Sequence, residues 1–197
     1  MPWVRWQLEH LDGPLDDTLH DPVSDQVALV LVLASPDETQ IRWISHATAT
    51  EWGRTKDELL AVASDNMTAL VAQAEITFDT IDGHKLGMIG TEWQAYKAAL
   101  LYSRGLKEKV EPVLGWPVFA VMPCRDFVFL VPAAAQELLA RVGPVVVKEY
   151  GQGAYPLSTE VFEITDAGTR AAFEFQKPPP PKPATPKKPK KDKGDKN

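Results

Sequence analysis

The feature that most restricts the fold is an uninterrupted run of eight apolar residues, Val27 to Ala34. A run of this kind is typical of a strand that lies in the middle of a sheet and is covered on both faces. It is much shorter than the roughly 20 apolar residues that a helix needs to span a bilayer, so no transmembrane segment is expected. The fold must therefore place further layers of structure on either side of this strand.

The strongest helix signal begins at Thr55. Thr55 and Glu58 match a capping box, in which the threonine hydroxyl accepts from the backbone N–H of residue 58 and the glutamate accepts from that of residue 55. Apolar residues then recur at spacings of three and four, as one face of a helix requires: Leu59, Leu60, Ala63, Met67, Leu70, Val71 and Ala74. The pattern predicts a long helix whose apolar face lies against a sheet or another helix.

Shorter patterns complete the expected fold. Further strands are predicted at 3–8, 40–45, 75–80, 85–89, 117–122, 127–131, 145–150 and 161–164, and further helices at 92–103, 106–114 and 133–142. Strands interleaved with helices in this way favour the α+β class. The prediction is one mostly antiparallel sheet built of strand-strand-helix units, with the helices on one face.

The charge is distributed unevenly between the body of the chain and its end. Residues 177–197 hold eight lysines, two aspartates and seven of the 17 prolines, which gives this segment a charge of +6. Residues 1–176 hold 13 Lys and Arg against 25 Asp and Glu, which gives −12. The end segment has no apolar side chain larger than alanine, so we expect an acidic globular domain at 1–176 and a disordered, polyproline-rich basic tail at 177–197.

Several classes of protein are not expected. The N-terminus lacks the charged and apolar regions of a secretory signal peptide, and Cys124 is the only cysteine, so a cytoplasmic protein without disulfides is predicted. No phosphate-binding loop, dinucleotide fingerprint, serine-hydrolase elbow or zinc-protease motif occurs. The acidic residues and histidines at positions 10–21 match no metal-binding spacing and are interpreted as a solvated loop. We therefore expect no cofactor and no bound metal.

Two residues could carry chemistry. Cys124 precedes Arg125, and a neighbouring cation lowers the pKa of a thiol, so Cys124 is a candidate nucleophile if His46 or His84 lies beside it as a base. The alternative is a small packed residue at the end of a strand. Asp126 is a second catalytic candidate. Arg125 and Asp126 could instead form a local turn contact, or anchor a ligand or a protein partner.

Two segments, taken in order, resemble the YtpQ-like family of bacterial proteins of unknown function. They are Glu51-Trp-Gly-Arg-Thr-Lys-Asp-Glu-Leu-Leu-Ala-Val-Ala-Ser-Asp-Asn-Met and Pro123-Cys-Arg-Asp-Phe-Val-Phe-Leu-Val, with a weaker similarity at Tyr155-Pro-Leu-Ser-Thr-Glu-Val-Phe. The chain departs from the family at Met67, where leucine is usual, and in its Lys- and Pro-rich end. The resemblance covers residues 25–165 and implies no reaction or cofactor. It marks five positions of interest: Trp52, Glu58, Asn66, Arg125 and Asp126.

The leading functional hypothesis is a non-enzymatic bacterial protein-interaction module, because an acidic body without catalytic motifs is joined to a basic arm. Binding candidates are Trp52, Asn66, Arg125 and Asp126 in the body and Lys187, Lys188, Lys190 and Lys191 in the arm. The arm could contact a protein, a polyanion or the body itself. One alternative is a small hydrolase or transferase that uses Cys124 or Asp126. Another is an acidic chaperone or immunity-type protein that masks a basic partner, which predicts a homodimer.

Overall fold

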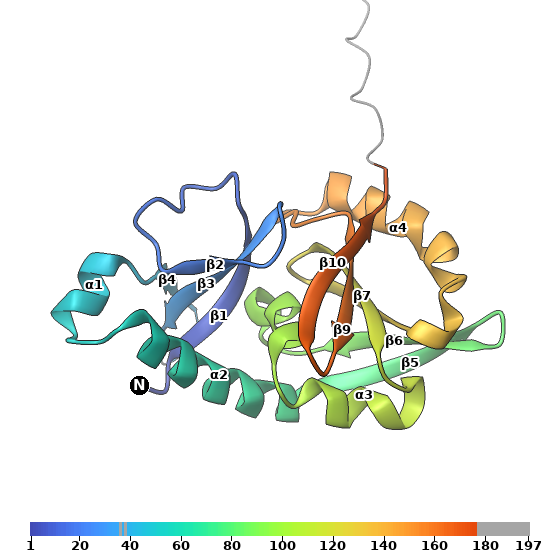
Figure 1. The fold of residues 1–197 in the computed structure, drawn as a ribbon, viewed down its shortest axis with the longest axis horizontal. Helices are drawn as coiled ribbons and strands as arrows, with labels where there is room; N and C mark the ends of the chain where they lie inside the picture. Colours follow the sequence, from blue (N-terminus) through green and yellow to red (C-terminus); the bar gives the residue numbers. More distant parts are fainter. Residues whose placement is uncertain (36, 38, 177–197) are drawn as a thin grey trace, which may run out of the picture.

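The computed structural model describes residues 1–35, 37 and 39–176, and their strands form two antiparallel sheets (Figure 1). The small sheet contains β1 (Val4–His10), β2 (His20–Pro22), β3 (Val27–Ala34) and β4 (Ile41–Trp43). The large sheet has the order β10-β9-β7-β8-β6-β5, with β5 (Glu75–Ile81), β6 (His84–Gly90), β7 (Val118–Cys124), β8 (Phe127–Pro132), β9 (Glu160–Thr165) and β10 (Gly168–Glu174). The predicted α+β class and antiparallel pairing are confirmed, although the strands divide between two sheets where one was expected.

The helices follow pairs of strands. The α-helices are α1 (His46–Glu51), α2 (Lys56–Gln73), α3 (Leu106–Leu114) and α4 (Leu138–Gln152), and the 3₁₀ helices are η1 (Gln94–Tyr96), η2 (Ala98–Tyr102) and η3 (Ala133–Ala135). Each of the hairpins β3–β4, β5–β6 and β7–β8 is followed by helical structure, so the predicted strand-strand-helix units are present. In the described part of the chain, no helix combines the length and the apolar character needed to cross a membrane.

The apolar run at 27–34 forms the central strand of the small sheet, as predicted. β3 pairs with β1 along one edge and with β2 and β4 along the other. Side chains on one face of β3, such as Val30 and Val32, join the main core between the two sheets. Leu31, on the opposite face, packs with Ile44 and Leu59 of a separate cluster beside α1 and α2. The two covered faces explain why every residue of the run is apolar.

The large sheet is covered by helices on both faces, where the sequence analysis expected one. All seven residues of β7 are buried, and successive side chains belong to different clusters. Phe119 and Val121 pack against α4, whereas Ala120 and Met122 face η2, α3 and the small sheet. Figure 1 shows α4 and α3 on opposite sides of this sheet. A strand with apolar residues at both alternating positions requires cover on both sides.

Three local predictions have clear outcomes. The capping box of α2 is confirmed, because the Thr55 side chain accepts from the Glu58 N–H and the Glu58 side chain accepts from the Thr55 N–H at 2.9 Å. The helix predicted at 92–103 is present as the shorter 3₁₀ helices η1 and η2. The strand predicted at 145–150 is wrong, since these residues continue α4 beyond Pro144. Their β-branched composition suggested a strand, but Val142 and Val146 are one helical turn apart and both face the sheet.

A buried polar contact joins the loop before β3 to the large sheet. The carboxylate of Glu160, at the start of β9, accepts from the Ser24 hydroxyl at 2.7 Å and from the Ser158 hydroxyl at 2.8 Å. Glu160 and Ser158 are both buried. The apolar core shared by the two sheets and this carboxylate contact together fix the two halves of the molecule side by side.

Candidate functional site

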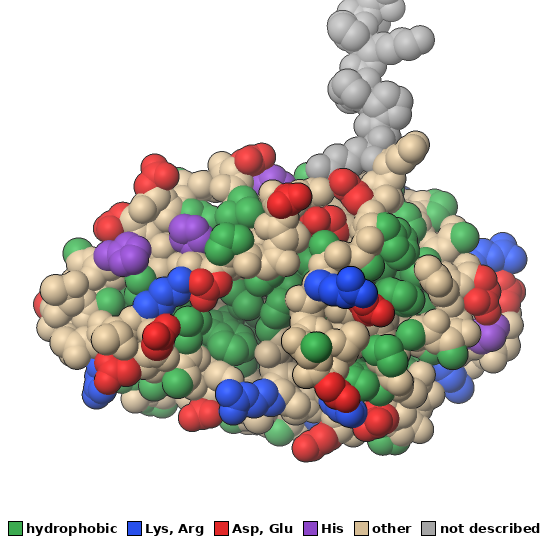
Figure 2. Space-filling view, viewed as in Figure 1, with side chains coloured by type: hydrophobic (Ala, Val, Ile, Leu, Met, Phe, Trp, Pro, Cys, Tyr) green, Lys and Arg blue, Asp and Glu red, His purple; other side chains and the backbone are tan. Residues whose placement is uncertain are grey.

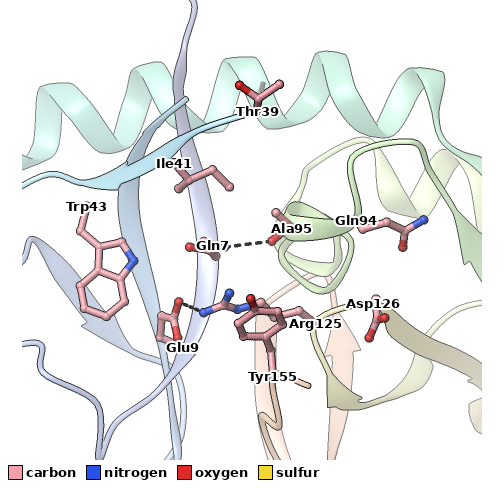
Figure 3. Close-up of a pocket in the computed structure, with 10 residues that line it drawn as sticks. All are labelled: Gln7, Glu9, Thr39, Ile41, Trp43, Gln94, Ala95, Arg125, Asp126 and Tyr155. Carbon is pink, nitrogen blue, oxygen red and sulfur yellow. Dashed lines mark hydrogen bonds and ion pairs between the residues drawn. The ribbon is translucent and has the colours of Figure 1, made fainter. Parts of the chain in front are cut away.

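A cleft of about 430 Å³ lies where the small sheet meets the turn between β7 and β8. The space-filling view shows apolar side chains gathered in the hollow between the two halves of the molecule (Figure 2). Ten residues from five parts of the chain line the cleft: Gln7, Glu9, Thr39, Ile41, Trp43, Gln94, Ala95, Arg125, Asp126 and Tyr155 (Figure 3). Of the sequence-predicted site residues, Arg125 and Asp126 are therefore brought to the cleft.

The small sheet provides one wall through the alternation of its strands. Gln7 and Glu9 of β1 share a sheet face with Ile41 and Trp43 of β4, because both strands pair with β3 at matching registers. Gln7 is buried, and its Nε2 donates to the carbonyl of Ala95 at 3.4 Å across the cleft. The polar face of β1 is thus turned toward the large sheet, where its side chains find polar partners.

Arg125 connects the two walls. Its guanidinium forms an ion pair with Glu9 and lies 4.4 Å from the centre of the Tyr155 ring. Figure 3 shows the guanidinium between the carboxylate and the ring. Only 18% of the Arg125 side chain and 13% of the Glu9 side chain are exposed, so the pair is more sheltered than a surface ion pair. Tyr155, by contrast, is 60% exposed, so its ring is presented to solvent over the guanidinium.

The backbone holds Tyr155 beside the turn. The Arg125 N–H donates to the Tyr155 carbonyl at 3.2 Å, and the Leu157 N–H donates to the Pro123 carbonyl at 2.8 Å. The second and third segments that resemble the YtpQ-like family are therefore neighbours in space, although about 30 residues separate them along the chain. Both contribute to the same wall of the cleft.

Cys124 lies just behind this wall as a protonated thiol. It is 3% exposed, and its S–H donates to Asp126 Oδ1 at 3.1 Å. Burial, together with the hydrogen bond to Asp126 and that residue's negative charge, raises the pKa of Cys124 to about 12. A cysteine nucleophile needs the opposite shift, because the thiolate is the reactive form. The neighbouring Arg125 does not produce that shift, since its guanidinium is directed to Glu9 and Tyr155.

Three of the four histidines have side-chain partners away from Cys124, and the fourth, His46, begins α1. His10 is close to Asp12, His20 contacts the Thr18 carbonyl, and His84 pairs with Glu137 at 2.9 Å. Among the interactions of the described residues, none joins a histidine to Cys124 or Asp126, so a cysteine–histidine pair is not assembled. Within the same residues, no three His, Cys, Asp or Glu side chains converge as metal ligands.

Asp126 is exposed at the tip of the turn. Its backbone carbonyl accepts from Lys97 Nζ at 2.7 Å, which fixes the turn to the segment between η1 and η2. Burial lowers the pKa of Lys97, an effect that the charge of Asp126 opposes. The arrangement leaves the Asp126 carboxylate at the rim of the cleft, where a ligand can reach it.

Trp52 and Asn66 lie outside the cleft and have structural contacts. Trp52 ends α1 and packs, half-buried, against the cluster between the small sheet and α2. The Asn66 amide donates to the carbonyl of Val4 at 2.8 Å and to that of Met1 at 3.2 Å. Asn66 therefore attaches α2 to the first strand. Lys187, Lys188, Lys190 and Lys191 lie outside the described residues.

Three residues that define the cleft were not among the predicted site residues: Glu9, Trp43 and Tyr155. The strand predicted at 40–45 contains Trp43, which the structure places in β4. However, nothing local indicates that these residues lie opposite residue 125, because the Glu9–Arg125 contact joins positions 116 residues apart.

Comparison of the chain with protein-family models, with curated proteins and with solved structures finds no match. The resemblance to the YtpQ-like family therefore stays a prediction, and the site is interpreted from its own geometry.

Proposed function

We propose that this chain is a non-enzymatic, cytoplasmic protein-interaction module that receives a short peptide segment of a partner in the cleft between its sheets. One observation carries the proposal: Tyr155 is 60% exposed in a cleft that Trp43 and Ile41 also line, and its ring is supported from behind by Arg125. Aromatic side chains and arginine are the residue types that contribute most binding energy at protein interfaces. A supported ring also loses little conformational freedom on binding.

The surrounding polar groups suit a peptide. The cleft has the size of a small-ligand pocket and is open along one side, with Gln94, Thr39 and Asp126 at its edge. Amide, hydroxyl and carboxylate groups can satisfy the backbone N–H and C=O groups of a bound segment. The charge of −12 on residues 1–176 favours a basic partner. An acidic chaperone or immunity-type protein that masks a basic partner would be a variant of the same binding function.

The protonated state of Cys124 gives the enzyme hypothesis no support. With the thiol buried, bonded to Asp126 and raised in pKa, both catalytic candidates are engaged with one another and lack a base among the described residues. The pair instead stabilises the turn that presents Arg125 to the cleft. We therefore assign Cys124 and Asp126 structural and binding roles in the proposal.

The test is selection of a random-peptide phage library against the full-length chain. Each round is counter-selected against the Tyr155→Ala/Asp126→Asn variant, so that peptides bound outside the cleft are removed. We expect an enriched sequence family whose synthetic peptides bind the native chain and lose about tenfold or more in affinity on Tyr155→Ala. The matched control is Val113→Ala, which shortens an exposed apolar residue on α3 and should leave the affinity unchanged. Failure to enrich, or enrichment that Tyr155→Ala does not affect, would overturn the proposal.

The Lys-rich segment supports a second, separate contact with a polyanion. Eight lysines within 21 residues favour counterion release on binding, which makes the affinity depend steeply on salt. We expect a chain truncated after Gln176 to lose binding to heparin and to anionic vesicles. Equal binding by the full-length and truncated chains at low salt would exclude this contact.

A further inference from the structure

Residues 177–191 contain a repeating pattern of prolines. Pro180, Pro183, Pro186 and Pro189 follow one another at intervals of three, and Lys182, Lys188 and Lys191 share a second set of positions with the same interval. A polyproline II helix has three residues per turn. In that conformation the four prolines would share one face, and the three lysines would share another. The segment thus has the pattern of a recognition sequence as well as the composition of a linker.

We propose that the cleft binds this proline-lysine segment of its own chain in the polyproline II conformation. This inference rests on the proposed function, because it identifies the class of peptide that the cleft accepts and names one such peptide. The occupant is the segment 180–191 of the same molecule. An external partner with a similar proline repeat would then compete with it for the cleft.

The chemistry of the cleft matches a proline repeat. Polyproline II segments bind to grooves lined by aromatic side chains, because proline rings pack flat on aromatic rings and the segment is already extended before binding. Trp43 and Tyr155 supply two such rings in one cleft, and Ile41 adds an apolar side chain to the same lining. Thr39 also lines the cleft, and its hydroxyl can donate to a carbonyl of the bound segment.

The charges are also complementary. Of the charged residues described in the lining, Glu9 and Asp126 are negative and Arg125 is positive. Arg125 is already paired with Glu9, which leaves the Asp126 carboxylate at the rim as an acceptor for a lysine, beside Lys97 on the carbonyl of the same residue. On a larger scale, the body carries −12 and the end segment +6. The lysine face of the repeat therefore meets a carboxylate at the rim and a negative surface.

The chain is long enough to bring the segment to the cleft. The Phe175 N–H donates to the Thr159 carbonyl at 2.9 Å, and Thr159 is four residues after Tyr155. Four residues span at most roughly 14 Å, and Phe175 to Gln176 adds up to about 4 Å. With about 5 Å between paired strands, Gln176 lies within roughly 23 Å of Tyr155. At 3.1 Å per residue in a polyproline II helix, about eight residues cover that distance, which leaves Pro186 and Pro189 available to bind even at the upper limit.

The first experiment places a paramagnetic label in the segment of the full-length chain. In the Ala184→Cys variant, a nitroxide reagent will modify the introduced thiol selectively, because the native Cys124 thiol is buried. We expect the backbone amide signals of Trp43, Ala95 and Tyr155 to lose intensity relative to the same sample after reduction of the label. Signals of the turn between β5 and β6, at the end of the large sheet away from the small sheet (Figure 1), should keep their intensity. The inference would be overturned if the loss of intensity were spread evenly over the surface, or if no signal lost intensity.

Two variants test the three-residue interval with matched composition. Pro183→Ser, Pro186→Ser and Pro189→Ser together remove three prolines of the repeat, whereas Pro178→Ser, Pro179→Ser and Pro181→Ser remove three that lie outside it. The first set should abolish the paramagnetic effect on Tyr155, and the second should keep it. Equal loss from both sets would overturn recognition of the repeat. In a mixture of labelled chain with unlabelled, isotope-enriched chain, an effect of equal size would overturn binding within one molecule.

A binding measurement separates this inference from the proposed function. Peptides selected by phage display should bind the variant with Pro183→Ser, Pro186→Ser and Pro189→Ser about three- to tenfold more tightly than the native chain. The reason is that these substitutions remove a tethered competitor whose effective concentration is near millimolar. If such peptides bind both chains equally and depend on Tyr155, the cleft is a peptide site and its occupant is not this segment. If no peptides depend on Tyr155, the proposed function itself fails.

Discussion

The segments at 51–67 and at 123–131 have different physical roles in this molecule. In the segment at 51–67, the side chains of Asn66 and Met67 turn inward: Asn66 donates to the carbonyls of Met1 and Val4, and Met67 is completely buried in the core. In the segment at 123–131, Arg125 and Asp126 turn toward a cleft that is open to solvent. A short sequence motif alone does not distinguish residues that stabilise the fold from residues that line a binding site. The two kinds are distinguished by what each polar side chain contacts.

The largest effect expected from this comparison is on stability, at Met67. Met67→Ala should lower the free energy of unfolding by about 2–5 kcal/mol, because it removes a buried side chain and leaves a cavity between α2 and the main core. Met67→Leu, which nearly conserves volume, should cost less than about 1.5 kcal/mol. Urea denaturation of the full-length chain measures both. A fully folded Met67→Ala protein that has lost peptide binding would contradict a purely structural role for this segment.

The next effect is expected at Asn66. Asn66→Ala should cost about 1–3 kcal/mol, because two backbone carbonyls near the start of β1 lose their side-chain donor. The adjacent Asp65→Ala is the control, since Asp65 is exposed and its removal should change stability by less than about 0.5 kcal/mol. Denaturation curves followed by circular dichroism compare them. Equal stability of the two variants would mean that Asn66 does not attach α2 to β1.

The parts of the fold that the sequence predicted depend on neighbours along the chain. The capping box at Thr55 and the apolar stripe of α2 are local patterns. The run at 27–34 also predicts its own burial, because apolar residues on both faces of a strand require cover on both sides. The strand predicted at 145–150 was wrong because three valines in a row suit a strand locally, whereas α4 places Val142 and Val146 on the large sheet. Tertiary packing outweighed the local preference there.

The candidate site was predicted in one wall only. Arg125 and Asp126 follow an apolar strand and precede another, so a displayed turn could be expected from position alone. Glu9 could not be predicted, because its role depends on how the small sheet packs against η1, η2 and the turn between β7 and β8, and no local pattern determines such packing. The polar alternation of β1 is equally compatible with a solvent-facing strand edge. Only the three-dimensional arrangement shows that it meets Arg125.

A double-mutant cycle compares one ion pair from each segment. Glu9→Gln with Arg125→Met should give a coupling energy of about 0.5–3 kcal/mol, because both partners are largely sheltered from water. Arg54→Gln with Glu58→Gln, which tests a pair that is 51% and 49% exposed, should give about 0.5 kcal/mol or less. The free energies come from urea denaturation at two salt concentrations. The coupling between Glu9 and Arg125 should persist at high salt, whereas the coupling between Arg54 and Glu58 should vanish. A stronger and more salt-resistant coupling for the Arg54–Glu58 pair would contradict the role of Arg125 as the link between the cleft walls.

The effect that is smallest at neutral pH, and the one that separates binding from chemistry in the second segment, concerns Cys124. Its pKa in the folded chain is raised to about 12, above the ordinary value for a thiol, so the folded state keeps the proton that the unfolded state loses. The contribution to stability is therefore complete below about pH 8.5 and is lost as the pH rises toward 12. The stability of native protein should fall more steeply over this range than that of Cys124→Ala.

Alkylation gives the kinetic version of the same test. Iodoacetamide at pH 8 should modify folded chain at least about a hundredfold more slowly than chain unfolded in urea, because the thiol is buried and almost entirely protonated. Asp126→Asn should speed the reaction, since the charge of Asp126 opposes ionisation of the thiol. Rapid, stoichiometric modification of the folded native chain would mean that the turn at 123–126 carries a reactive thiolate. The wall of the cleft would then be a catalytic surface, and the division between a folding segment and a binding segment would have to be redrawn.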